Sequence, residues 1–232
     1  MRRIVRLDVK RGFVIKGKRF EGFRKLGSFE EIVKRYTAES NIEFFFYDAV
    51  ATLFGINSIP KLLNETLRFT FLPVCIGGGL HNQRQVEECI SDGVDRVALN
   101  FMCFDSPDLV EKLVLRYGSQ AVVGNVEARK IGGSWVAMHS TAREVGRESL
   151  LDHLKRLEQL GVSEIFLSAV DHDGMLNGFP NELLEKIDPF ANVPYVLSGG
   201  LTQFEDQEVS NNFEFVKGIA ISRALHEGLI KL

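Results

Sequence analysis

The feature that most constrains the fold of this chain is a set of sequence matches between its two halves. The stretch from Pro73 (PVCIGGGL) resembles the stretch from Pro194 (PYVLSGGL), 121 residues later. Three further matches keep nearly this spacing: Asp48 with Asp171 (123 residues), VALN at 97–100 with IAIS at 219–222 (122 residues), and Asp8 with Glu127 (119 residues). One such match is common in α/β proteins, but four in the same order predict two similar halves, about 1–119 and 120–232.

Short β-rich runs alternate with amphipathic stretches along the chain, which indicates a parallel sheet covered by helices. We expect strands at 4–8, 43–48, 71–76, 96–100, 121–127, 164–169, 195–198 and 215–221, with hairpin-like excursions around 13–16 and 135–138. We expect helices at 29–38, 59–67, 83–92, 107–117, 148–160, 182–187 and 203–210, with Ser28, Asn82, Ser106 and Thr202 as N-caps. Eight strands in two similar halves favour a single (β/α)8 barrel of the TIM type over an open doubly wound sheet.

Charge and cysteine content narrow the possible functions. A formal net charge of −3 lacks the basic surplus typical of nucleic-acid binding, although a small anionic ligand remains compatible with it. The three cysteines form no CxxC pair, so buried thiols in a reducing compartment are expected, and we assign no metal or other cofactor. An apolar run long enough to span a bilayer is lacking, and the first strand carries Arg6 and Asp8, so we expect a cytoplasmic protein without membrane contact.

Two glycine-rich turns follow predicted strands half a barrel apart, at 77–79 and at 198–200. Glycine lets backbone N–H groups approach an anion closely, and the active face of such a barrel lies at the C-terminal ends of its strands. The following strands end in Asn100 and Ser222. These positions favour two phosphate sites and a small substrate with a phosphate at each end, while turns without a ligand are the alternative.

Asp8 and Glu127 end the first and fifth predicted strands, so the symmetry places them across the mouth from one another. Two carboxylates there suit a general acid and a general base, because burial and proximity push their pKa values apart. The alternative is that each caps a loop or pairs with a cation such as Lys10, Lys16 or Arg129.

Several motifs resemble the cyclase subunit (HisF) family of imidazole glycerol phosphate synthase. They are LDVKRGFVIKGKRFEGFRKLGS, CIGGGLHN, RVALN, GSQAVVGNVEAR, EIFLSAVDHDGMLNGF and VLSGGL, and the likeness covers nearly the whole chain. The string KGxxFEGxRxxG distinguishes this family from the related isomerase that precedes it in histidine biosynthesis. The resemblance implies an enzyme that takes ammonia from a glutaminase (HisH-like) docked at the N-terminal face. It would convert a phosphoribulosyl formimino carboxamide ribotide (PRFAR) to imidazole glycerol phosphate and an aminoimidazole carboxamide ribotide (AICAR).

The resemblance also implies roles for individual residues. Asp8 and Glu127 match the catalytic carboxylates, and Lys16 matches the lysine of the mobile first loop. The matching phosphate positions are Gly79, Asn100, Phe101, Asp173, Gly174, Gly200, Ile221 and Ser222, and Ser140, Ser168 and Ser198 match polar positions around the substrate. The charged ring that gates ammonia entry in the family is matched by Arg2, Glu43, Arg96 and Glu164, for which ordinary ion pairs at strand starts are the alternative.

Three positions depart from the family pattern. Arg6 replaces a small residue and, by strand alternation, points into the barrel, where it must find an anion such as Asp8, Glu127 or substrate. Glu127 stands where the family has aspartate, and Phe101 replaces a small hydroxyl residue. Similar departures occur in HisF-like paralogues thought to supply ammonia for amidination of an acetamido sugar in surface-polysaccharide synthesis.

Structural patterns would distinguish the three functions that remain open. An Arg6–Glu127 pair favours the paralogue, whereas an unpaired Asp8 facing Glu127 across an open mouth favours the cyclase. A blocked mouth together with no anion bound at either glycine turn favours the third possibility, a non-catalytic scaffold for a glutaminase.

Overall fold

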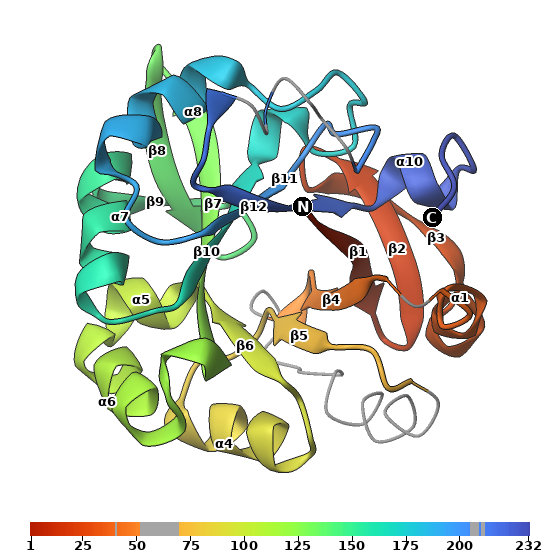
Figure 1. The fold of residues 1–232 in the computed structure, drawn as a ribbon, viewed down its shortest axis with the longest axis horizontal. Helices are drawn as coiled ribbons and strands as arrows, with labels where there is room; N and C mark the ends of the chain where they lie inside the picture. Colours follow the sequence, from red (N-terminus) through yellow and green to blue (C-terminus); the bar gives the residue numbers. More distant parts are fainter. Residues whose placement is uncertain (40, 52–69, 205–208, 210–211) are drawn as a thin grey trace.

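In the computed structural model, eight parallel strands close into a barrel with helices around its outside (Figure 1). The structure describes residues 1–39, 41–51, 70–204, 209 and 212–232. The barrel strands are β1 (Arg2–Lys10), β4 (Glu43–Asp48), β5 (Val74–Gly77), β6 (Arg96–Leu99), β7 (Val122–Ile131), β10 (Glu164–Ala169), β11 (Tyr195–Ser198) and β12 (Val216–Ile221). They pair in this order, and β12 pairs back with β1 to close the ring. The predicted (β/α)8 barrel is confirmed.

Helices cover the outside of the barrel in Figure 1. They are α1 (Phe29–Tyr36), α4 (Gln83–Ser91), α5 (Phe101–Asp105), α6 (Pro107–Tyr117), α7 (Leu150–Gln159), α8 (Asn181–Ile187) and α10 (Arg223–His226), with 3₁₀ turns η1 (Ser119–Ala121), η2 (Val170–His172) and η3 (Asp188–Phe190). The short helices α5 and α10 were not predicted. The predicted helix at 59–67 lies outside the described residues, and the one at 203–210 lies largely outside them. Within the described segments, no helix has the length and apolarity needed to cross a membrane.

Helix starts follow the predicted caps in part. The side chains of Ser28 and Asn82 each accept a hydrogen bond from the third backbone N–H of the helix that follows, as predicted. Ser106 does occupy the N-cap position of α6, as predicted, but its hydroxyl donates to the Asp105 carboxylate at 2.7 Å and makes no cap bond. The helix that Thr202 would cap lies largely outside the described residues.

Each half of the barrel carries an antiparallel hairpin after its first strand. In the first half these strands are β2 (Phe13–Lys18) and β3 (Glu21–Ser28), and in the second they are β8 (Ser134–His139) and β9 (Glu144–Ser149). The turn before each hairpin has two residues with positive φ, at 11–12 and at 132–133, as two-residue hairpin turns require. The hairpin-like excursions expected from the sequence are therefore complete strand pairs. The boundary between halves at about residue 119 stays a prediction.

The strand register shows which positions in the two halves are equivalent. Asp8 lies opposite Tyr47, and Glu127 lies opposite Ser168, which follows Tyr47 by 121 residues. Asp8 and Glu127 therefore occupy the same level of the barrel, as the sequence match predicts. The predicted match of Asp48 with Asp171 is wrong by two residues, because the same register puts Ala169 at the level of Asp48.

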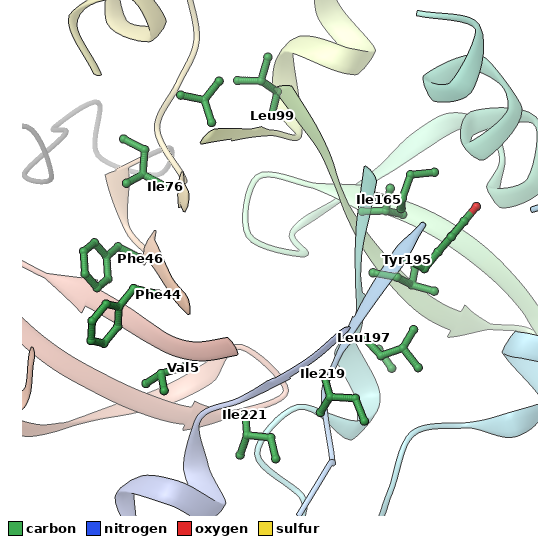
Figure 2. Packing of buried hydrophobic residues seen from close by; sticks show 14 of the residues in the cluster. Val5, Phe44, Phe46, Ile76, Leu99, Ile165, Tyr195, Leu197, Ile219 and Ile221 are labelled. Atoms are coloured by element: carbon green, nitrogen blue, oxygen red, sulfur yellow. The ribbon is translucent and has the colours of Figure 1, made fainter. Parts of the chain in front are cut away.

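Two apolar layers hold the barrel together. Outward side chains from successive strands pack between the barrel and its helices, and Figure 2 labels several of them, including Phe44, Leu99 and Ile219. A smaller cluster fills the lumen, where the rings of Phe45 and Phe166 lie 4.2 Å apart between their centroids. The inner cluster separates the charged ends of the lumen from each other.

Close packing requires glycine in the turns after β5 and β11, independently of any ligand that the turns bind. A Cβ atom on Gly78 would lie 2.3 Å from the carbonyl oxygen of Asp48, and one on Gly199 would lie 2.6 Å from the carbonyl oxygen of Ala169. Both residues also have positive φ, at +85° and +110°, where side chains are disfavoured.

We expect Gly78→Ala to lower the free energy of unfolding by at least about 2 kcal/mol, because the new methyl group meets backbone atoms of β4. Gly132→Ala is the matched control, since Gly132 also has positive φ but a Cβ there meets nothing within 4 Å. The control should lose about 1 kcal/mol. Urea unfolding of both variants measures the difference, and equal losses would contradict this account.

Candidate functional site

Asp8, near the C-terminal end of β1, belongs to a buried network of alternating charges. Its Oδ1 accepts a hydrogen bond from Arg6 Nε at 2.8 Å, and its Oδ2 accepts one from Lys16 Nζ at 2.7 Å. Lys16 also donates to both carboxylate oxygens of Asp173, at 2.9 and 3.1 Å. Of the partners considered from the sequence, Asp8 thus takes Lys16 together with Arg6.

The charges in this network fix the protonation states of its members. Burial alone would raise the pKa of Asp8, but the cations Arg6 and Lys16 outweigh burial and lower it to about 2. Burial likewise opposes the charge of Arg6, and the carboxylates of Asp8 and Asp173 more than offset this, so the pKa of Arg6 is raised. Asp8 is therefore held as a carboxylate.

Glu127, on β7, has a different environment. Its Oε1 accepts a hydrogen bond from the Tyr47 hydroxyl at 2.6 Å, and its Oε2 accepts one from the Ala142 backbone N–H at 2.7 Å. Burial dominates and raises its pKa, while these hydrogen bonds and the charge of Arg6 oppose the rise. The two acids at this level of the barrel are thus shifted in opposite directions.

Tyr47 and Ala142 are site residues that sequence reasoning missed. Tyr47 was detectable in part, because alternation along β4 from Glu43 through Phe45 puts its side chain on the inner face. Ala142 acts through its backbone, which ends a run of three left-handed residues at 140–142 with φ between 55° and 58°. Such a run of left-handed backbone conformations costs free energy for residues other than glycine, and no sequence pattern predicts it.

The structure brings the predicted phosphate positions of the first half into one small pocket. Gly79, Asn100 and Phe101 line it together with Tyr47 and with Ser140, one of the predicted polar positions around the substrate. The side chain of Asn100 donates to two backbone carbonyl groups, at 2.9 and 3.0 Å. Its amide group is therefore occupied in holding the strand ends, which leaves backbone groups and hydroxyls as the local donors for an anion.

The predicted positions of the second half lie in a separate pocket across the mouth. It is lined by residues that include Lys16, Asp173, Gly174, Ser198, Gly200, Ile221 and Ser222. In the part of the chain that the structure describes, the buried hydroxyl of Ser222 has no hydrogen-bond partner. Since buried hydroxyls normally have partners, this group suits an oxygen-rich ligand. Each of the two pockets leaves about 10 Å³ of free space, so a phosphate needs the lining to move.

The hairpin of β2 and β3 covers the mouth. The backbone N–H of Arg19 donates to the Asp173 carbonyl at 2.8 Å, and Gly174 packs against the backbone of Gly17. Neither pattern that would separate cyclase from paralogue is present, because Arg6 pairs with Asp8 instead of Glu127 and Asp8 is not unpaired. Ser168, the remaining predicted polar residue, accepts a hydrogen bond from Arg6 below the mouth.

Four charged residues close the opposite, N-terminal end of the lumen. Arg2 donates to Glu43 through two bonds of 2.6 Å and also bonds Glu164. Arg96 completes the square by donating to Glu43 at 3.1 Å and to Glu164 at 3.3 Å. The four predicted ring residues therefore do form one continuous ring of alternating charge, half-buried at the strand starts.

We expect Asp173→Asn to loosen the mouth hairpin, because it removes the charge-assisted bonds from Lys16, worth about 1.5–3 kcal/mol. A loss of this size raises the open population roughly tenfold or more. Tryptic cleavage after Lys18 or Arg19 should accelerate by the same factor, since cleavage follows the open population. Asp171→Asn is the control, because Asp171 bonds the Lys130 N–H at the other hairpin. An unchanged cleavage rate in Asp173→Asn would contradict the tether.

Comparison with known proteins identifies the family of this chain. A family model described as histidine biosynthesis protein matches residues 3–231. The imidazole glycerol phosphate synthase subunit HisF of Legionella pneumophila is 32% identical over 207 residues, which cover 89% of this chain and 98% of the relative. The HisF subunits of Corynebacterium glutamicum (strain R) and Metallosphaera sedula are each 34% identical and cover 86% of this chain and 80% of the relative. The chain therefore belongs to the histidine biosynthesis protein family, as a HisF-like member.

Proposed function

We propose that this chain is the cyclase subunit of an imidazole glycerol phosphate synthase, which uses ammonia to convert PRFAR to imidazole glycerol phosphate and AICAR. The observation that carries the proposal is the pair of buried acids, Asp8 and Glu127, at one level of the barrel. Their pKa values are shifted in opposite directions, and two small polar pockets lie on either side of them.

The opposite shifts match the two proton transfers that such a reaction needs. Attack by ammonia requires a group that accepts a proton, and release of the amine product requires a group that donates one. Asp8 is ionised and suits the base, whereas burial raises the pKa of Glu127 and makes its carboxyl group easier to protonate, which suits the acid. Tyr47 and the Ala142 N–H hold the Glu127 carboxyl at a fixed position. Proton transfer requires such a fixed position, because a displacement of about 1 Å lowers the rate strongly.

The two pockets suit the two phosphates of the substrate. The first pocket offers the turn at Gly79 and the backbone near Asn100, with Phe101 and Ser140 at its side. The second offers the turn at 199–200, the hydroxyl of Ser222 and the ammonium group of Lys16. When substrate binds, the ammonium group of Lys16 would move from Asp8 to a phosphate. Because Lys16 lies on the hairpin, opening of the hairpin and loss of the Lys16–Asp8 bond would be one event.

We place a glutaminase partner at the N-terminal face, over the ring of Arg2, Glu43, Arg96 and Glu164, which would gate the entry of ammonia. Phe71 supports this placement of the partner, because it lies in the segment leading into the N-terminal end of β5 and is fully exposed. Exposed aromatic side chains of this kind are enriched at protein interfaces. Met1, beside the ring residue Arg2, is 46% exposed.

Asp8→Asn should lower ammonium-dependent turnover of PRFAR by at least about two orders of magnitude, as expected when a general acid or base is removed. The assay follows loss of substrate absorbance with the purified chain and an ammonium salt. Asp105→Asn, an exposed acid on α5, is the control and should keep full activity. An unmodified protein without turnover would overturn the cyclase function and favour amidination of a sugar.

Phe71→Asp should lower glutamine-dependent turnover in the presence of a HisH-type glutaminase by about tenfold or more, as for loss of an interface hot spot. Turnover with ammonium salt should stay unchanged, because that assay bypasses the partner. Phe13→Asp is the matched control, since Phe13 is an exposed aromatic residue of the hairpin at the opposite end of the barrel. Equal losses in the two variants would place the partner elsewhere.

A further inference from the structure

Arg6 is a fully buried cation at the centre of the site, and it takes part in neither of the two proton transfers assigned to Asp8 and Glu127. Its side chain is 1% exposed. Nε donates to Asp8 at 2.8 Å, while Nη1 donates to Ser168 at 3.0 Å and to Ser198 at 3.2 Å. These bonds tie β1 to β10 and β11 on the far side of the lumen.

Aromatic rings enclose the same guanidinium group. Its central carbon lies 5.0 Å from the ring centroid of Phe20, 5.1 Å from that of Tyr47 and 6.0 Å from that of Phe45. Such contacts favour a cation where water is excluded. Hydrogen bonds on one side and rings on the other therefore leave the group a single orientation.

The two cations that touch Asp8 differ in how they are held. Lys16 comes from the hairpin that covers the mouth, and its ammonium group is shared with Asp173. Arg6 comes from the same barrel strand as Asp8, two residues before it, and its hydrogen-bond partners all lie on barrel strands, while the Phe20 ring beside it belongs to the hairpin. Opening the hairpin removes Lys16 from Asp8 and leaves Arg6 in place.

We propose that Arg6 is a positioning residue that keeps Asp8 ionised and correctly oriented once Lys16 has moved to the substrate. This inference rests on the proposed base role of Asp8. Arg6 acts through the carboxylate of Asp8, and it directs the base role to this acid and the acid role to Glu127.

Other titratable groups around Asp8 and Arg6 are Lys16, Asp173, Glu127, Tyr47 and His226. Burial lowers the pKa of His226 to about 4, so this residue of α10 is neutral at working pH. Burial raises the pKa of Tyr47 well above its usual value, so its hydroxyl stays protonated. The remaining cations next to Asp8 are Arg6 and Lys16, so their effects on the pKa of Asp8 can be compared directly by replacing one at a time.

The test titrates the Asp8 carboxyl group by ¹³C NMR, with Asp8→Asn to assign the signal. Arg6→Gln keeps hydrogen-bond donors but removes the charge, and we expect it to raise the pKa of Asp8 by at least about one unit. Arg6→Lys restores a cation and should keep the pKa of Asp8 near its original value. In Lys16→Gln, Asp8 should still titrate well below its usual range, because Arg6 remains.

The same change in the pKa of Asp8 should appear in the pH dependence of turnover. With free ammonia held constant at every pH, the acid limb of the turnover profile should move upward in Arg6→Gln and return in Arg6→Lys. A purely structural Arg6 would lower thermal stability in both variants without moving the Asp8 titration, and that result would overturn the proposal.

The Lys16→Gln variant keeps the proposal falsifiable if Arg6→Gln does not fold. An Asp8 pKa that returns to its usual range in Lys16→Gln would show that Lys16 carries the effect, and would overturn the role of Arg6. Failure of the unmodified protein to turn over PRFAR would instead overturn the proposed function, while the NMR titration would still decide what Arg6 does to Asp8.

Discussion

Closure of the barrel turns every second strand residue toward one narrow lumen, so each charged group there must find its partners inside it. The structure meets this constraint at two levels. Half-buried ion pairs join Arg2, Glu43, Arg96 and Glu164 at the strand starts. Near the strand ends Arg6, Asp8, Lys16 and Asp173 alternate in sign. Apolar side chains such as Phe45 and Phe166 separate the two levels.

This separation divides the functions that a cyclase subunit needs. The lower ring lies where ammonia would enter, and the upper network lies where substrate would bind. Because the charges at each level balance one another locally, a proton or ligand that changes one level has little direct effect on the other. Burial then raises the pKa of Glu127, whereas the neighbouring cations outweigh the burial of Asp8 and lower its pKa.

Much of the barrel was predictable from the sequence, and the reasons are local. The strand at 43–48 keeps its predicted bounds, because a compact apolar run with an acid at each end leaves little choice. β7 extends four residues beyond its predicted end, because pairing with β8 continues it past the barrel. Alternation predicted that Arg6 points inward, but its choice of Asp8 depends on how the hairpin and the opposite strands pack. The bond from Tyr47 to Glu127 joins residues 80 apart in sequence, which no local pattern reveals.

The unequal lengths of the two hairpin arms have a further consequence. β7 runs four residues past Glu127, whereas β1 runs only two past Asp8, so the second arm overhangs the rim by about 6–7 Å more. The added residues are whole antiparallel pairs at the turn end of the hairpin, so the pairing of Glu127 with Met138 corresponds to that of Asp8 with Ile15. The two arms thus differ in reach, and a barrel of this kind can lengthen its rim without disturbing the residues below it.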